Sequence, residues 1–174
     1  MADLLGIKIA ELQPSVEMIK AIVKQRSIKE AQEIVQIEQA VNVSNEMHLL
    51  AMRIAKPGIK EYEIANAIQY LAANKECQMS YPPIVTINGG ILHNHYRLNT
   101  LKDGDLFLND SGAETAMGYA GDLTRTFPVS NTFSTKQKEM YEVVLNAFNK
   151  AQKLLKPGTK FKDIHLKASQ HLVE

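Results

Sequence analysis

Two aspartates near the middle of the sequence lie in patterns typical of paired β-strands. Asp110 closes the run DLFLND, where side-chain alternation places it on one face with Leu106 and Leu108. Asp122 lies within the run YAGDLTRTF, where it shares a face with Ala120, Thr124 and Thr126. If the two strands pair, the carboxylates converge on one apolar surface. Because burying an unpaired carboxylate is costly, such a pair requires cations, a shared proton or strong hydrogen-bond donors.

Three roles are open to this aspartate pair: a paired acid and base, metal ligands, or turn and capping residues. Ser-Gly follows Asp110, so an Asx turn is one reading of that residue. Asp122 lies within a strand-like run, where aspartate is disfavoured unless something holds it. Paired carboxylate oxygens suit Mg, Mn or Zn, and a bridging carboxylate can hold two metal ions. Two carboxylates alone are too few ligands, so a dinuclear site needs further donors.

Two histidines precede the aspartates in the stretch GGILHNHYRLN. His93 and His95 would share a face if this segment were extended, so they could act together. A histidine beside paired metals can donate to a substrate carbonyl or polarise it. The alternative is a pair of loop histidines that bind only solvent. The other histidines lie in helical patterns without a partner pattern and are interpreted as surface or packing residues: His48, His165 and His171.

The elements that must position these groups follow from hydrophobic periodicity and turn residues. Pro82 and Pro83 exclude a helix before the β-branched run IVTI, and Lys102-Asp103-Gly104 predicts the turn into the aspartate hairpin. The predicted order is a short helix over 15–24, a long helix over 28–55, a helix over 60–75, a strand over 84–87, the aspartate hairpin over 105–127, and a helix from Ser134 to Leu155.

The sequence contains an internal repeat. RIAKPGIKEYEI, ending at Ile64, and KLLKPGTKFKDI, ending at Ile164, share a helix, a Lys-Pro-Gly stop and a second helix. Strands and the aspartate hairpin follow the first copy, whereas the second copy stops at Glu174. We therefore expect a fragment whose second repeat is cut short, with unsatisfied packing faces. The alternative is that two helical hairpins share a common stop by chance.

Composition restricts the class of protein. The 174 residues are 45% hydrophobic, enough for the core of one soluble globular domain. The net charge of +1 gives no overall electrostatic reason to expect a nucleic acid or membrane partner. Cys77 is the only cysteine, which favours a reducing compartment and is interpreted as a buried apolar thiol. Without a secretory signal or a membrane-length apolar run, a cytoplasmic protein is expected.

With LHNHY, LFLNDSGAE and GYAGDLTRTFPV in order, the sequence resembles the metal-dependent Xaa-Pro aminopeptidases and prolidases of the pita-bread fold. The resemblance runs from Arg26 to Glu174 through SIKEAQEI, YPPIV, KDGDL and FSTKQKEMYEVVL. Methionine aminopeptidases share the fold and the aspartate pair but look less similar through TRTFPV. The resemblance implies an α+β pita-bread fold, of which only the N-terminal half is present. Residues 1–25 would end a preceding domain or form a connector, and 26–174 would begin the catalytic domain.

The same resemblance implies roles for individual residues. Asp110 and Asp122 would be ligands of two divalent metal ions, most commonly manganese, with zinc or cobalt possible, and Asp122 would bridge them. His93 matches the family's active-site histidine, and His95 matches a local His-Tyr-x-x-Asn pattern as the candidate for substrate binding. The hairpin holds one residue more than the commonest spacing, which a bulge in the turn at 115–118 can absorb. The family's other ligands, a histidine and two glutamates, have no matching motif after Asp122.

The implied activity is release of the N-terminal residue from peptides with proline second, by metal-activated water. The parent protein would be the aminopeptidase, and this chain alone would be inactive. The alternative is a pita-bread module that binds peptides or partners without catalysis, against which the two intact aspartates argue. An exposed apolar surface where the second half should pack favours a homo-oligomer.

Overall fold

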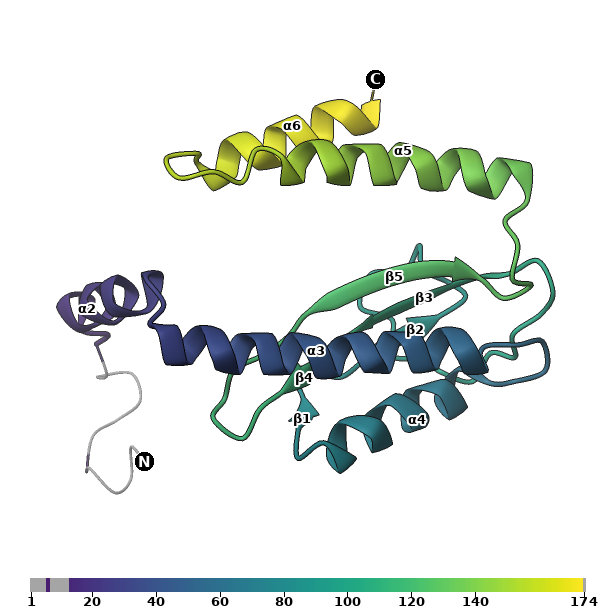
Figure 1. The fold of residues 1–174 in the computed structure, drawn as a ribbon, viewed down its shortest axis with the longest axis horizontal. Helices are drawn as coiled ribbons and strands as arrows, with labels where there is room; N and C mark the ends of the chain where they lie inside the picture. The colour runs from purple at the N-terminus through teal and green to yellow at the C-terminus, as the bar shows by residue number, and fades with distance from the viewer. Residues whose placement is uncertain (1–5, 7–12, 174) are drawn as a thin grey trace.

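The computed structural model describes residue 6 and residues 13–173 of the chain. Most of the first twelve residues of the expected connector 1–25 therefore lie outside the described part. The first described helix, α2 (Val16–Ser27), begins at Ser15, whose side chain accepts a hydrogen bond from the Met18 amide at 3.2 Å. The helix has no buried residue and lies at one end of the molecule (Figure 1). The short helix predicted here is present, three residues longer than expected at its end.

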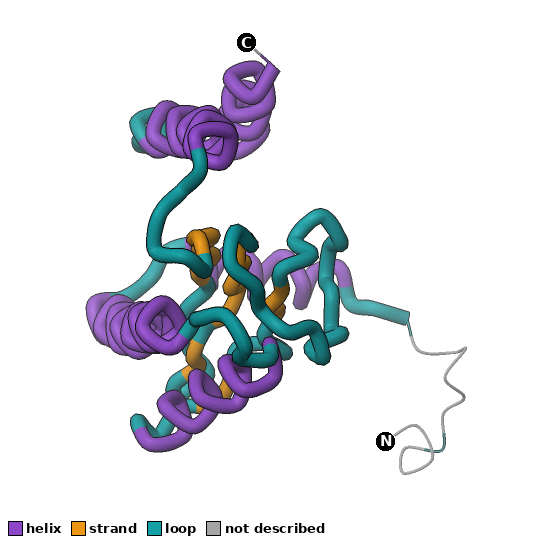
Figure 2. Tube along the Cα trace, turned by 90° about the vertical axis from the view of Figure 1, so that its right-hand side faces the viewer, coloured by secondary structure: helices purple, strands orange, loops and turns teal. Residues whose placement is uncertain are grey.

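Helices α3 (Ala31–Ile54) and α4 (Glu61–Asn74) form an antiparallel pair that covers one face of a sheet (Figures 1 and 2). The predicted Lys-Pro-Gly stop joins them, and Gly58 takes a φ of +94°, which suits glycine because it has no Cβ. Both helices bury small and medium apolar residues at helical spacing, so the backbones approach the sheet closely. These residues are Ala40, Val43, Met47, Ala51, Ile64, Ala65, Ile68 and Ala72.

The main sheet is antiparallel, with strand order β2-β3-β5. Its strands are β2 (Ile84–Thr86), β3 (Leu106–Ser111) and β5 (Leu123–Pro128). A second, two-stranded sheet pairs β1 (Gln78–Met79) with β4 (Ala113–Glu114). The predicted aspartate hairpin is confirmed, since Asp110 of β3 stands opposite Thr124 of β5. Its turn is closed by the Gly118 amide, which donates to the Thr115 carbonyl at 2.9 Å.

The two faces of β3 have different environments. Phe107, Asn109 and Ser111 are buried against the helices, whereas the alternate residues, including Leu108 and Asp110, are half-buried on the other face. The predicted grouping of the aspartate with leucines is therefore confirmed. The face of Asp110 is not the core face, because Phe107, Asn109 and Ser111 pack against the helices on the opposite face of the sheet.

Helices α5 (Thr135–Gln152) and α6 (Phe161–Val173) repeat the arrangement of α3 and α4. Ser134 caps α5, as predicted, by accepting from the Gln137 amide at 3.3 Å. A second Lys-Pro-Gly turn joins the two helices, with Gly158 at a φ of +87°. The pair packs mainly against itself and stands apart from the sheet (Figures 1 and 2). The internal repeat is thus a structural repeat of one helical hairpin.

The described helices include none that is both long and apolar enough to cross a membrane. The Cys77 thiol is free and buried, as expected for a packing cysteine, and burial raises its pKa.

Candidate metal and active site

Two glycines allow the aspartate-bearing segments to approach one another. A Cβ on Gly112, two residues after Asp110, would lie 1.8 Å from the carbonyl oxygen of Gly121. Gly121 directly precedes Asp122, and a Cβ there would lie 2.4 Å from the Ser44 hydroxyl oxygen. Neither position has room for any side chain. The Gly residues of the DSG and AGD stretches therefore determine how close the two carboxylates can come.

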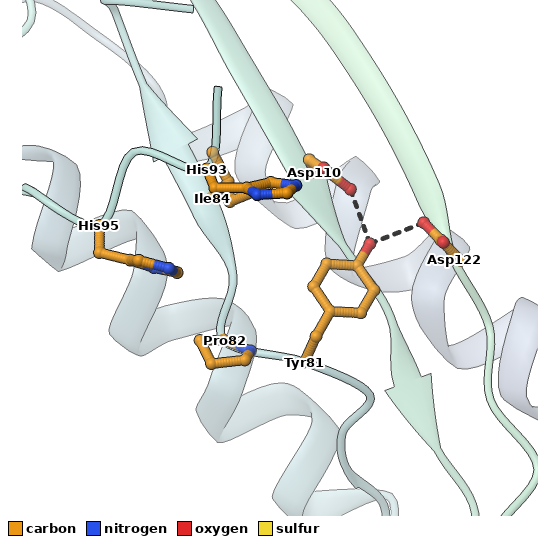
Figure 3. A pocket seen from close by; sticks show the side chains of 7 residues that line it. All are labelled: Tyr81, Pro82, Ile84, His93, His95, Asp110 and Asp122. Atoms are coloured by element: carbon orange, nitrogen blue, oxygen red, sulfur yellow. Dashed lines mark hydrogen bonds between the residues drawn. The ribbon is translucent and has the colours of Figure 1, made fainter. Parts of the chain in front are cut away.

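The Tyr81 hydroxyl lies between the two aspartates (Figure 3). Its oxygen is 2.6 Å from Asp110 Oδ1 and 2.8 Å from Asp122 Oδ1, so the two carboxylates share one phenolic donor. Burial raises the pKa of Tyr81 far above its usual value, and its hydrogen bonds to the two carboxylates raise it further. The phenol therefore stays protonated. Tyr81 also lines the candidate site, and it was not predicted from the sequence.

A pocket opens beside this contact. In Figure 3 the His93 ring points toward Asp110, whereas His95 lies farther from the aspartates. The extended conformation considered for the segment that carries them is not present. The segment instead turns at His93, whose φ is +54°. The pocket is lined by Tyr81, Pro82, Ile84, His93, His95, Asp110 and Asp122.

All four residues singled out in the sequence for chemistry thus meet in one pocket. Their environments differ, because Asp110 is half-buried within β3 while Asp122 is exposed and lies just before β5. Two interpretations of these aspartates are therefore excluded. Asp122 is not inside a strand, and Asp110 is no Asx-turn residue, because it pairs in mid-sheet and accepts from Tyr81.

Oxygen donors of this kind fit hard or borderline divalent cations. The carboxylates of Asp110 and Asp122 both accept from the Tyr81 hydroxyl. Their oxygens are therefore close enough for the two side chains to bind one cation. Within residues 13–173, however, no three His, Cys, Asp or Glu side chains come together as a metal-binding group. Asp110 and Asp122 alone therefore do not make a complete metal-binding group among these residues.

A buried polar network supports Asp110 from the opposite face of β3. His48 Nε2 lies 3.1 Å from the Ser111 carbonyl oxygen, and Asn109 Nδ2 lies 3.2 Å from His48 Nδ1. The Ser111 hydroxyl donates to Asn109 Oδ1 at 2.9 Å. Burial lowers the pKa of His48, which favours a neutral ring that donates from Nε2 and accepts at Nδ1.

Of the two interpretations of His48, packing is confirmed and surface is wrong, because His48 is 2% exposed. Its hydrogen bonds, which the sequence did not indicate, tie α3 to the strand of Asp110. The sequence feature that could have indicated this contact is in β3. Asn109 and Ser111 are two residues apart and so share one face, and buried polar side chains need hydrogen-bond partners. Of the other two histidines, His165 is exposed on α6 and His171 contacts Lys150 of α5.

The fold is that of a metallopeptidase. The chain belongs to metallopeptidase family M24, whose sequence profile matches residues 35–174. Members of this family use divalent metal ions, which agrees with the oxygen donors of the pocket.

Individual relatives give the same result. The chain is 44% identical over 141 residues to the Xaa-Pro aminopeptidase of Haemophilus influenzae, covering 79% of this chain and 32% of that protein. It matches the structure of Pseudomonas aeruginosa aminopeptidase PepP with a TM-score of 0.82 and 36% identity, over 85% of this chain and 34% of that one. The prolidase from Pyrococcus furiosus gives a TM-score of 0.84 at 26% identity, over 92% and 52% of the two chains.

These likenesses confirm the expected α+β pita-bread fold and the Xaa-Pro aminopeptidase and prolidase resemblance. The chain spans about a third of the length of the curated relatives that it matches, 32% for those from Haemophilus influenzae and Escherichia coli.

Proposed function

We propose that this chain contributes the first carboxylates of a metal-dependent aminopeptidase that releases the N-terminal residue from peptides with proline second. The observation that carries the proposal is the meeting of Asp110 and Asp122 at the Tyr81 hydroxyl, in a pocket that His93 and His95 also line. The substrate class is supported by the Xaa-Pro aminopeptidases that the chain resembles.

In this proposal Asp110 and Asp122 would hold two divalent ions, with Asp122 shared between them as the family resemblance implies. Manganese would be the metal, with zinc or cobalt as the alternatives. Such ions, when bound, polarise a carbonyl and lower the pKa of water, which is the chemistry that peptide hydrolysis needs. Tyr81, protonated at neutral pH, orients the two carboxylates by donating between them. His93, which points toward Asp110, donates to the substrate carbonyl. His95 contacts the substrate from the outer side of the pocket.

The 174-residue chain alone is proposed to be inactive, because two carboxylates do not complete a dinuclear ligand set. The purified chain should therefore fail to hydrolyse an Xaa-Pro dipeptide with added Mn²⁺. Hydrolysis that disappeared in Asp110→Asn would overturn this part of the proposal.

Partial metal binding can be measured directly on the chain. Electron paramagnetic resonance of free Mn²⁺ should show weak binding, and Asp110→Asn or Asp122→Asn should weaken it about tenfold or more. Asp103→Asn is the matched control, since Asp103 is an exposed turn residue outside the pocket. Equal binding by all four proteins would contradict the assignment of the aspartates as ligands.

A non-catalytic module is the second candidate, and one observation favours it: no three His, Cys, Asp or Glu side chains of the described residues come together as a metal-binding group. Such a module would bind a peptide with proline second equally well with and without a chelator. The aminopeptidase would bind metal in the parent protein and lose hydrolysis in Asp110→Asn. The two measurements separate the candidates.

We also propose that the chain self-associates through α5. Met140, Val143 and Val144 are 61%, 42% and 57% exposed. Ala40 and Val43 of α3, one hundred positions earlier in the repeat, are buried against the sheet. The second hairpin thus presents the face that the first one buries. Light scattering would test this, and a strictly monomeric sample at high concentration would count against it.

We place the protein in the cytoplasm, on the single ground that its one cysteine is a free, buried thiol. Neither a nucleic acid nor a membrane partner is proposed. Fractionation of cells that produce the protein would test its location.

A further inference from the structure

We propose that Glu61 is a positioning residue that holds the histidine loop, defined as residues 88–98, in place. Glu61 is the first residue of α4 and its side chain is completely buried. Its carboxylate accepts from the Ile87 amide at 2.8 Å, directly before the loop. It also accepts from Asn99 directly after the loop, at 3.3 Å from the amide and 3.0 Å from the side chain. One carboxylate therefore ties the two ends of the loop together.

The backbone of α4 strengthens this clamp. The Glu61 amide donates to the Asn99 carbonyl at 3.1 Å, and the Tyr62 amide donates to the Arg97 carbonyl at 3.0 Å. These are first-turn amides, which have no partner within their own helix. The positive end of the helix dipole also favours a carboxylate at this position. The returning end of the histidine loop is thus fixed to the start of α4 by side chain and backbone together.

Burial of a carboxylate calls for a specific reason. The ion pairs found among the described residues do not include Glu61, so neutral N–H groups satisfy its charge. An apolar residue would avoid the cost of removing this charge from water. The equivalent residue of the second helical hairpin, one hundred positions later, is the apolar Phe161. The helix–turn–helix unit therefore does not itself require a glutamate here, and what distinguishes the first unit is the loop that Glu61 binds.

The loop needs such support because it has no helix or strand of its own. His93 takes a left-handed backbone conformation, with a φ of +54°, which a non-glycine residue keeps only when its surroundings enforce it. Asn94 gives local support, since its side chain donates to Thr86 Oγ1 at 3.3 Å and accepts from the Tyr96 amide at 3.0 Å. Glu61 holds the base of the same loop. Without the clamp, His93 would relax from its position beside Asp110.

The test on this chain is hydrogen exchange in Glu61→Gln, which keeps the shape but directs an NH₂ group at backbone donors. Exchange in residues 87–99 should rise by about tenfold or more, because hydrogen bonds to a charged acceptor are among the stronger ones. Exchange in β3 should not change. Glu63→Gln is the control, since Glu63 is exposed on the same helix turn and binds only the Lys60 amide. An unchanged loop, or an equal rise in α3, β3 and the loop, would overturn the proposal.

The functional consequence rests on the proposed aminopeptidase activity and is measured separately in the parent protein. Glu61→Gln should lower kcat while metal content is retained, and the decrease should vanish in a His93→Ala background, because Glu61 acts through His93. A decrease that persists in that background would overturn the positioning of His93. If the parent shows no hydrolysis at all, the proposed function fails, while the exchange experiment still decides whether Glu61 holds the loop.

Discussion

A Cβ on Gly112 would lie only 1.8 Å from the carbonyl oxygen of Gly121, so the two backbone segments are in direct contact there. This backbone contact joins the segment after Asp110 to the segment before Asp122. The Ser80 hydroxyl donates to the same Gly121 carbonyl at 2.8 Å, which links the contact to the residue before Tyr81. The geometry of the carboxylate pair therefore depends on close backbone packing as much as on the aspartates themselves.

Gly112→Ala should destabilise the chain by roughly 1–3 kcal/mol or more, because the new methyl group meets backbone that cannot move aside. Urea unfolding followed by circular dichroism measures the change. Gly90→Ala is the matched control, since a Cβ on Gly90 meets nothing within 4 Å. If both variants unfold at the same urea concentration, the close approach of the two strands is not present in solution.

Tyr81→Phe should destabilise the metal-free chain by about 1 kcal/mol, because it leaves two neighbouring carboxylates without their common donor. Tyr70→Phe, at a tyrosine that is 71% exposed, should have no such effect. A second measurement uses the raised pKa of Tyr81. Absorbance titration to about pH 11 should give the same tyrosinate signal in Tyr81→Phe as in the original chain, because Tyr81 stays protonated while an ordinary phenol ionises near pH 10. A smaller signal in the variant would show that Tyr81 titrates normally.

His48 should make stability depend on pH. Burial lowers the pKa of His48 below its ordinary value of 6.5; the hydrogen bond to the Ser111 carbonyl opposes this effect and Arg125 adds to it. Below that pH the unfolded chain binds a proton that the folded chain does not, so the free energy of unfolding decreases as the pH falls. His48→Gln should lose less stability than the original chain between about pH 7.5 and about pH 5.5. His165→Gln, at an exposed position, serves as control. An equal loss in all three proteins would show that His48 binds the same number of protons in the folded and unfolded states.

The order of elements could be predicted because each carries its own local signal. The stops at Pro57 and Pro157, the cap at Ser134 and the alternation around Asp110 all depend on residues near one another in sequence. The four candidate site residues could be chosen for the same reason, since each stands in a recognisable local pattern. Tertiary packing then brought them to the pocket where they were expected.

What could not be predicted depends on contacts between distant segments. Tyr81 lies 29 residues before Asp110 and 41 before Asp122, and a tyrosine before two prolines carries no local sign of either contact. The burial of Glu61 is equally hidden, because a glutamate in a first helical turn is ordinarily an exposed dipole partner. The core face of β3 could not be identified from the sequence, because its residues Asn109 and Ser111 are polar. Their burial depends on hydrogen bonds to His48, which is 61 and 63 residues away in the sequence.

The exposed face of α5 should control association of the chain. Val144→Lys places a charge at a position that is 57% exposed, so the monomer tolerates it, whereas burial of the same charge in an interface is costly. The variant should remain monomeric at concentrations where the original chain associates, as measured by sedimentation equilibrium. Lys138→Glu, at an exposed charged position of the same helix, controls for a general effect of charge. If Val144→Lys associates as strongly as the original chain, self-association does not use the face of α5 that corresponds to the buried face of α3.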